Sequence, residues 1–490
     1  MTGLVDRTRA TLARAAAVYR GSPYARMLDE TAARLDEPLR VAIAGRVKSG
    51  KSTLLNALVG ERLAPTDAGE CTRIVTWYLD GHTYQVMIHP REGDPLPGRF
   101  SRDDGAIEVD LGGRPPDDVS ELVVTWPSQA LRATTLIDTP GIGSLSERVS
   151  RRAWDLLAAD DEETPADAVL YLMRHLHVGD VEFLHAFHDT EVSRPNPVNA
   201  IGVLSRADEI GVGRADSMSS ARTIAGRLAG DATVRRVVQT VVPVAGLLAE
   251  TAMTLTEAEV GQLRRIAGRT APEVEGLLLS VDRFVNSMPE LGLTSLERKR
   301  LLDRFGVFGV RKCSTLLRQQ VVGTASDLAR ELVTLSGLDE LRSVLRSLFY
   351  ERRDVLKSRS ALLALDSVLR SQPRAGSRAV AAEVEEIVAS AHPFHELRVL
   401  SAIRAGGVQG KSEVITELEH LIGGAGTAAT LRLRLPPDAR PSEITAAASA
   451  ALLRWQRRAE NPLTRHEMSM AARVAIRSCE GIMAAQEARR

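Results

Sequence analysis

A short stretch near the N-terminus has the residue types and the spacing that hold a nucleotide phosphate. GRVKSGKS (45–52) fits the pattern GxxxxGK[ST] through Gly45, Gly50, Lys51 and Ser52. Glycines let the backbone fold around phosphates, the lysine meets the β- and γ-phosphates, and the serine hydroxyl ligates Mg²⁺. A strand-like run before the motif and a helix-like run after it disfavour a chance match. The predicted nucleotide contacts are Gly45, Lys48, Ser49, Gly50, Lys51, Ser52 and Thr53.

A similar stretch near the C-terminal end provides an internal comparison. AGGVQGKS (405–412) has Ala405 where the pattern requires its first glycine, and no strand-like run leads into it. We therefore predict a loop before a helix there, and no phosphate site.

The metal side of the site is predicted from two further stretches. LIDTPG (136–141) places Asp138 at the end of a strand, where a carboxylate can hold Mg²⁺ through water. The amide of Gly141 in the same stretch can contact the γ-phosphate. APTDAGECTRIVTW (64–77) contains Thr72, the predicted switch threonine that closes on Mg²⁺, with Thr66 as the second candidate.

The base side of the site is predicted around Asp208 in VLSRADEIG (203–211). A carboxylate can accept two hydrogen bonds from the edge of guanine, and adenine does not offer that pair of donors. Ser205 and Arg206, and Ala245 in VVPVAG (241–246), are predicted beside the base. The alternative for Asp208 is an exposed turn residue. The order of the motifs, each after a strand, favours a GTPase.

Strand-like and helix-like stretches alternate over the first half of the chain and would position these residues. Strands are predicted at 40–45, 121–126, 134–138, 168–173, 200–205 and 240–245, and two short helices within 3–36. This alternation predicts an α/β sheet with helices on both faces. Because the two ends of such a domain would emerge close together, the N-terminal helices can join a later bundle.

Beyond about residue 250 the pattern becomes helical. Leucines and a valine at intervals of seven residues predict one long helix from Ser336 to Leu369, capped by Ser336 and Asp339. Later helices are predicted at 378–404, 412–422, 442–459 and 464–488, the last capped by Thr464 and Glu467.

Composition restricts the class of protein. Lys+Arg and Asp+Glu both number 63, so the formal charge of zero gives no general attraction to nucleic acid. The three cysteines are far apart, which predicts reduced thiols in a cytoplasmic protein. No signal peptide and no apolar run long enough to span a bilayer is recognised, so any membrane contact is expected to be peripheral.

The motifs GKSTLLNALVGERLAPTDAGECTRIVTWY, LIDTPG, SRADEIG and LSGLDELRSVLRSLFYERRDVLK resemble the dynamin superfamily, and most of all the isoniazid-inducible dynamin-like proteins of mycobacteria. The resemblance implies a large GTPase domain at 38–335, N-terminal helices at 1–37 that join a bundle, and a helical neck and short trunk at 336–490. It also implies GTP and Mg²⁺ as ligands and pairing of the GTPase heads with a second copy or a related dynamin-like partner. Membrane remodelling in the cell-envelope stress response would follow.

The chain departs from that family at three positions near the nucleotide. Ser205 and Arg206 replace the usual Asn or Thr followed by Lys, and the Arg206 guanidinium can still lie over the base. Lys48 stands where eukaryotic dynamins carry a serine that acts with a monovalent cation. We predict that Lys48, with Lys51 and Thr72, stabilises charge during hydrolysis; the alternative is a solvated loop lysine. No catalytic glutamine follows Gly141, so hydrolysis is expected to be slow and stimulated by dimerisation.

Two other features have open interpretations. His175, His177, His185 and His188 could form a zinc site, or else lie on the surface or between domains. In the stretch 423–441, three leucines alternate with two arginines, and the leucine side chains could insert into a bilayer. The alternative is an edge strand or a loop that packs on the bundle. A functional alternative to membrane remodelling is a GTP-switched scaffold that regulates a longer dynamin-like partner.

Overall fold

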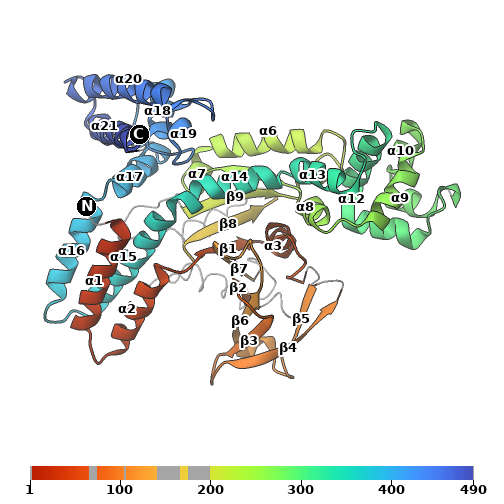
Figure 1. Ribbon diagram of the computed structural model, residues 1–490, viewed down its shortest axis with the longest axis horizontal. Coiled ribbons are helices and arrows are strands. Elements are labelled where there is room, and N and C mark those ends of the chain that lie inside the picture. The colour runs from red at the N-terminus through yellow and green to blue at the C-terminus, as the bar shows by residue number, and fades with distance from the viewer. Residues whose placement is uncertain are drawn as a thin grey trace.

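A ten-stranded mixed sheet carries the predicted motifs (Figure 1). The computed structural model describes residues 3–65, 74–103, 106–140, 166–174, 199–287 and 289–488. The strands, in chain order, are β1 (Leu39–Gly45), β2 (Val75–Asp80), β3 (Gln85–Pro90), β4 (Leu96–Asp103), β5 (Ala106–Asp110), β6 (Val119–Trp126), β7 (Thr134–Asp138), β8 (Ala168–Met173), β9 (Ala200–Ser205) and β10 (Val241–Val244). Their order across the sheet is β10-β9-β8-β1-β7-β2-β6-β3-β4-β5.

The five strands from β10 to β7 are parallel and contain the motif-bearing runs. All six predicted strands are present, with ends that differ by a few residues at most. Because the carboxyl ends of parallel strands meet at one edge, Gly45, Asp138 and Ser205 end their strands on the same side of the sheet.

Helices cover both faces of this sheet, as the alternation predicted. Val41 and Ile43 of β1 belong to one buried cluster, and Ala42 and Ala44, which point the other way, belong to a second. The first cluster includes side chains of α3 (Lys51–Val59) and α14 (Leu338–Leu348), and the second includes α6 (Ser217–Gly230) and α8 (Gly246–Met253). The fold is therefore an α/β domain with a helical C-terminal region.

The sequence analysis missed β2 to β5, the strands that widen the sheet beyond β7. β2 runs antiparallel to β7, and β3, β4 and β5 form an antiparallel extension with β6. β4 contains Pro97 and Gly98, and β3 ends at Pro90, residues that usually interrupt strands. Pairing at the edge of the sheet overrides those local signals.

The remaining helices are α1 (Leu4–Val18), α2 (Pro23–Arg34), α7 (Ala232–Arg235), α9 (Glu257–Ala267), α10 (Ala271–Leu277), α11 (Val281–Asn286), α12 (Ser295–Arg318), α13 (Ala325–Leu335), α15 (Arg353–Ser371), α16 (Ser377–Ser390), α17 (His392–Arg404), α18 (Ser412–Leu421), α19 (Ala429–Leu433), α20 (Pro441–Glu460) and α21 (His466–Glu487). α9, α10 and α12 form the end of the molecule farthest from the termini (Figure 1). No helix of the described ranges is both long enough and apolar enough to cross a bilayer.

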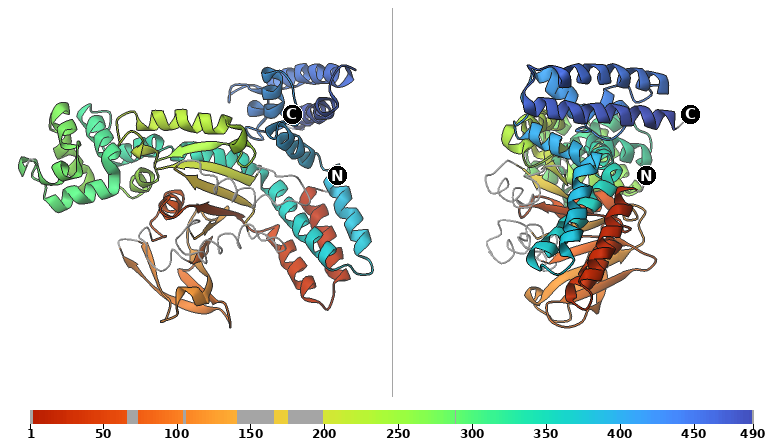
Figure 2. Two further views of the ribbon diagram at one scale, coloured as in Figure 1. Left: turned by 180° about the vertical axis from the view of Figure 1, so that it is seen from behind. Right: turned by 90° about the vertical axis from the view of Figure 1, so that its left-hand side faces the viewer.

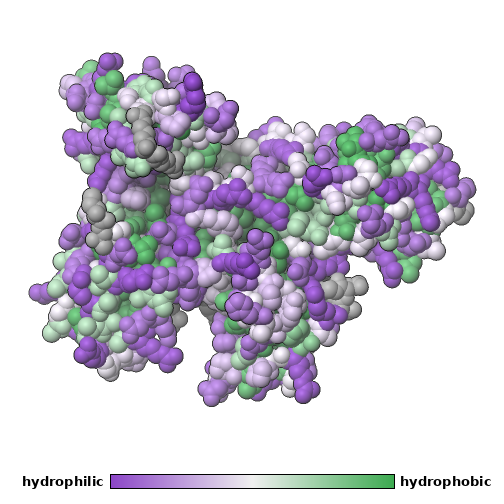
Figure 3. Space-filling model, in the orientation of Figure 1, coloured by the Kyte–Doolittle hydropathy of each residue, from purple (hydrophilic) through white to green (hydrophobic). Residues whose placement is uncertain are grey.

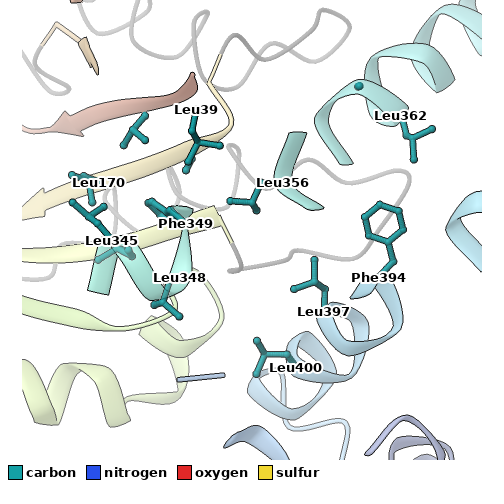
Figure 4. Close-up of a cluster of buried hydrophobic side chains, with 14 of the residues drawn as sticks. Leu39, Leu170, Leu345, Leu348, Phe349, Leu356, Leu362, Phe394, Leu397 and Leu400 are labelled. Carbon is teal, nitrogen blue, oxygen red and sulfur yellow. The ribbon is translucent and has the colours of Figure 1, made fainter. Parts of the chain in front are cut away.

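The predicted long helix from Ser336 to Leu369 is wrong. It is two helices, α14 and α15, separated by a short 3-10 turn at Tyr350–Arg352, and α14 begins after Gly337 rather than at a Ser336 cap. α14 lies against the sheet and α15 packs with α1, α2 and α16, so the two halves face different partners (Figure 2). Figure 4 shows Leu348, the last residue of α14, and Phe349, which precedes the turn, between strand side chains and those of α17.

Three other local predictions are corrected. The helix expected at 378–404 is divided at Ala391, because Pro393 in the first turn of α17 has no N–H to continue α16. Thr464 does not cap α21; its hydroxyl donates to the Arg458 carbonyl. Within 423–441, residues 429–433 form the helix α19 rather than a strand or an open loop.

N-terminal and C-terminal segments meet beside the sheet. The Tyr19 hydroxyl donates to the Gln372 carbonyl at 2.7 Å, and Arg14 pairs with Glu383. The amine of Lys357, which is 4% exposed, donates to the carbonyls of Arg34 and Glu37. α1, α2, α15 and α16 thus form one helical group, and α17 to α21 form a lobe beyond it (Figure 1). The domain limits at 37/38 and 335/336 stay a prediction.

Candidate functional site

The loop between β1 and α3 has the conformation that a phosphate requires. Gly45 has φ +146°, and a Cβ there would lie 2.5 Å from the Leu172 carbonyl of the neighbouring strand β8. Gly50, at φ +92°, precedes the first residue of α3. Only glycine adopts both conformations without strain. The loop therefore ends at a helix N-terminus, where backbone N–H groups attract an anion.

Lys51 is folded over this loop. Its ammonium donates to the carbonyls of Gly45 and Arg46, each at 3.3 Å. Burial lowers the pKa of Lys51, and the Asp138 carboxylate opposes that shift. Burial likewise raises the pKa of Asp138, against the Lys51 charge and the hydrogen bond from Ser52. Both groups are thus short of stabilising charge, which a phosphate and a cation would supply.

Ser52 and Asp138 meet as the sequence predicted. The Ser52 hydroxyl, in the first turn of α3, donates to Asp138 Oδ2 at the end of β7 at 2.8 Å. Asp138 Oδ1 is buried and has no hydrogen-bond partner among the described residues. A hydroxyl and a carboxylate with an unpaired oxygen fit Mg²⁺, which prefers oxygen ligands. These two residues are the described ones that would hold it.

A cavity of about 150 Å³ lies beside the loop, toward β9 and β10. Its lining is Ser49, Gly50, Thr53, Leu54, Leu172, Val203, Ser205, Arg206, Asp208, Glu209, Val244, Gly246 and Leu247. The structure therefore brings the loop residues Ser49, Gly50 and Thr53 to the same cavity as Ser205, Arg206 and Asp208. Ala245 is buried, and its neighbours in the sequence, Val244 and Gly246, both line the cavity.

Asp208 lines this cavity and is buried, with 7% of its surface exposed. It lies in a 3-10 turn directly after β9. Burial raises the pKa of its carboxyl to about 6, against the charges of Arg206 and Arg174. A buried carboxylate of this kind gains from hydrogen bonds donated by ligand N–H groups.

Arg206 connects the base side of the cavity with the phosphate loop. Its backbone is left-handed, at φ +52°, and one guanidinium nitrogen donates to the Lys48 carbonyl at 3.0 Å. Another guanidinium nitrogen of Arg206 pairs with the Glu209 carboxylate at 2.9 Å. Glu209 also pairs with Arg174. Lys48 itself is exposed and left-handed, at φ +61°. Arg206 thus holds the loop backbone that carries Lys48.

Several predicted residues lie outside the described ranges: Thr66, Thr72, Gly141 and the histidines at 175, 177, 185 and 188. The similar stretch at 405–412 is a loop that leads into α18 and has no strand before it, as predicted. The sequence analysis missed seven residues that line the cavity: Leu54, Leu172, Val203, Glu209, Val244, Gly246 and Leu247. Leu172 could have been identified from the sequence, because it lies near the carboxyl end of a strand that the sequence analysis predicted.

Comparisons with known proteins identify a matching family and similar chains. Residues 41–206, which contain the loop, Asp138 and Arg206, match the model of the dynamin family. The bacterial dynamin-like protein of Nostoc punctiforme is 31% identical over 120 residues, which cover 22% of this chain and 17% of that one. A chain of an oligomerised bacterial dynamin pair is 12% identical, covers 99% of this chain and 75% of its own, and has a TM-score of 0.32.

The chain belongs to the dynamin family of GTPases. Its similarity extends over nearly the whole length to the isoniazid-induced protein IniC of Mycobacterium tuberculosis, which is 41% identical over 492 residues that cover 99% of each chain. The predicted resemblance to the isoniazid-inducible dynamin-like proteins is therefore confirmed.

Proposed function

We propose that the protein binds GTP with Mg²⁺ in the cavity between the β1–α3 loop and Asp208, and hydrolyses it to GDP and phosphate. The observation that carries this proposal is the cavity, which is lined both by residues of the phosphate loop and by a buried carboxylate. Dynamin family membership supports guanine as the base. Two N–H donors of guanine would stabilise the ionised form of the Asp208 carboxyl, which burial disfavours in the nucleotide-free protein.

Each residue has a proposed role. Lys51 leaves its two carbonyl partners and binds the β- and γ-phosphates, and Ser52 and Asp138 hold Mg²⁺, which neutralises developing phosphate charge when bound. Thr72 and Gly141 are proposed to close on the metal and the γ-phosphate. Lys48, exposed beside the loop, is proposed to stabilise charge where other dynamins use a monovalent cation.

Calorimetric titration of the full chain with GDP, GTP and ADP tests the proposal. Guanine nucleotides should bind in the presence of Mg²⁺, ADP should bind far more weakly, and Lys51→Ala should lose affinity for both guanine nucleotides. Lys411→Ala is a matched control, because it changes the lysine of the similar GKS sequence that lies in a loop. Binding of ADP as tight as that of GDP, or equal losses from both substitutions, would contradict the proposal.

The cellular role is a second part of the proposal. We propose a peripheral protein that couples head dimerisation to membrane remodelling in the cell-envelope stress response; membership of the dynamin family and the similarity to an isoniazid-induced protein support this role. Of the alternating leucines, Leu431 is 41% exposed, whereas Leu433 and Leu435 pack on the bundle and Arg432 pairs with Glu396. Any lipid contact through 423–441 is therefore proposed to rest on Leu431, and Leu431→Asp should weaken co-sedimentation with anionic liposomes.

The alternative is a GTP-switched scaffold that regulates a longer dynamin-like partner. Liposome tubulation by the pure protein with GTP supports remodelling, whereas GTP turnover without any change in liposome shape supports the scaffold. Head dimerisation predicts that turnover per molecule rises with protein concentration, which size-exclusion chromatography with GDP and GTP can follow in parallel.

A further inference from the structure

α12 is broken at the point where it passes the predicted base-recognition residue. Gly306, inside this helix, has φ +64° and ψ 175°, a conformation open essentially to glycine alone. A Cβ added at Gly306 would lie 3.4 Å from Asp208 Oδ2. The break in α12 therefore faces the Asp208 carboxylate directly, although the two residues are far apart in the sequence.

The break is supported by the surrounding structure. An interruption of a helix leaves backbone carbonyls without their usual partners. Just before the break, the Arg304 carbonyl accepts a hydrogen bond from the hydroxyl of Thr251, a fully buried residue of α8. Phe305 and Phe308, on either side of Gly306, are also buried. The conformation of Gly306 is thus fixed by packing and by a dedicated hydrogen bond.

α12 also holds the loop that follows Asp208. Arg311 donates to the Gly213 carbonyl, and its guanidinium pairs with Glu275 of α10 at 2.8 Å. Gly213, at φ +69°, lies so close that a Cβ there would be 3.2 Å from the backbone nitrogen of Phe308. The segment that contains Asp208 is therefore in contact with α12 both at its start and at its end.

We infer that Gly306 is a positioning residue for Asp208: the glycine break in α12 sets where the carboxylate lies and so determines discrimination for guanine. This inference rests on the proposed function, because it assumes that Asp208 accepts the N1–H and the 2-amino group of guanine. Residue 306 does not itself touch the nucleotide and acts through Asp208.

An alanine at position 306 would be strained at φ +64°, and relief of that strain requires rotation of the backbone toward a helical conformation. The two halves of α12 would then change their relative direction beside Asp208. Asp208 would lose its place opposite the two guanine donors, while the phosphate loop on the other side of the cavity would keep its contacts. The predicted defect is therefore in base discrimination rather than in phosphate binding.

Comparison of GDP with inosine diphosphate separates these effects. Hypoxanthine retains the N1–H donor of guanine and lacks the 2-amino group, so the ratio of the two affinities reports the second hydrogen bond to Asp208. For Gly306→Ala we expect the GDP preference of the wild type to fall at least about tenfold, which equals about 1.4 kcal/mol. Gly292→Ala is the control, since Gly292 has a similar φ of +65° in the segment before α12 and lies beside Arg265.

The outcomes distinguish failure of the proposed function from failure of the inference about Gly306. A wild-type protein without preference for GDP over ADP would contradict the proposed function itself. A wild type that prefers GDP, with an unchanged GDP to inosine diphosphate ratio in Gly306→Ala, would overturn only the inference. A merely structural role would lower both affinities together. If Gly306→Ala does not fold, Thr251→Val removes the hydroxyl that supports the break, and an unchanged ratio in that variant overturns the inference.

Discussion

The raised pKa of Asp208 makes a prediction about how GDP affinity depends on pH. Its carboxyl has a pKa of about 6, against 3.8 for an exposed aspartate, because burial disfavours the charged form. Only the ionised carboxylate accepts both guanine donors. With a pKa near 6, about 90% of molecules are ionised at pH 7 and about 10% at pH 5. GDP affinity should therefore fall about tenfold between pH 7 and pH 5.

An unshifted aspartate would behave differently, since it stays more than about 90% ionised at pH 5. The assay is calorimetric titration with GDP at intervals between pH 5 and pH 7.5. The GDP phosphate also titrates in this range, so Asp208→Asn serves as the control: it keeps the phosphate titration and removes the carboxyl. Parallel pH profiles for the wild type and Asp208→Asn would refute the reasoning.

The same shift has the opposite effect on the nucleotide-free protein. Between pH 4 and 6 the folded chain binds more protons at Asp208 than the unfolded chain, so this group's contribution to the free energy of unfolding rises as the pH falls through 6. Binding of GDP at pH 6 should in turn release part of a proton, which titrations in buffers of different ionisation enthalpy can detect.

Three further predictions concern other residues of the site and the helical junction. Lys357→Met should lower the free energy of unfolding by about 1–3 kcal/mol in urea titrations, because two backbone carbonyls lose their hydrogen-bond donor. Lys299 is exposed, so Lys299→Met should have little effect. Equal effects of the two substitutions would argue against a stabilising role of the Lys357 hydrogen bonds. Ser52→Ala should weaken the Mg²⁺ dependence of GTP binding, measured by titration with and without EDTA, and an unaltered dependence would remove Ser52 from the metal site. Lys48→Ala should slow GTP turnover and make it depend on potassium, and a variant of unchanged rate and cation response would leave Lys48 a solvated loop residue.

The local sequence was sufficient for the phosphate loop and for the strands that lead into the site. Gly45 and Gly50 require backbone conformations that only glycine tolerates, and apolar β-branched runs before them fix the strands. Since parallel strands end at one edge, the meeting of Ser52 with Asp138 also followed from the sequence. Helix breaks did not, because the leucine repeat is the same whether α14 and α15 are continuous or separated.

By itself, then, the sequence indicated which residues are proposed to hold phosphate, metal and base, because backbone freedom, charge and strand order can be inferred from neighbouring residues. The tertiary structure alone decided that Gly306 lies against Asp208 and that Lys357 holds the end of α2. Those contacts join segments far apart in the chain. They are set by the packing of whole helices on the sheet, where burial of large apolar faces outweighs the local preference of any one residue.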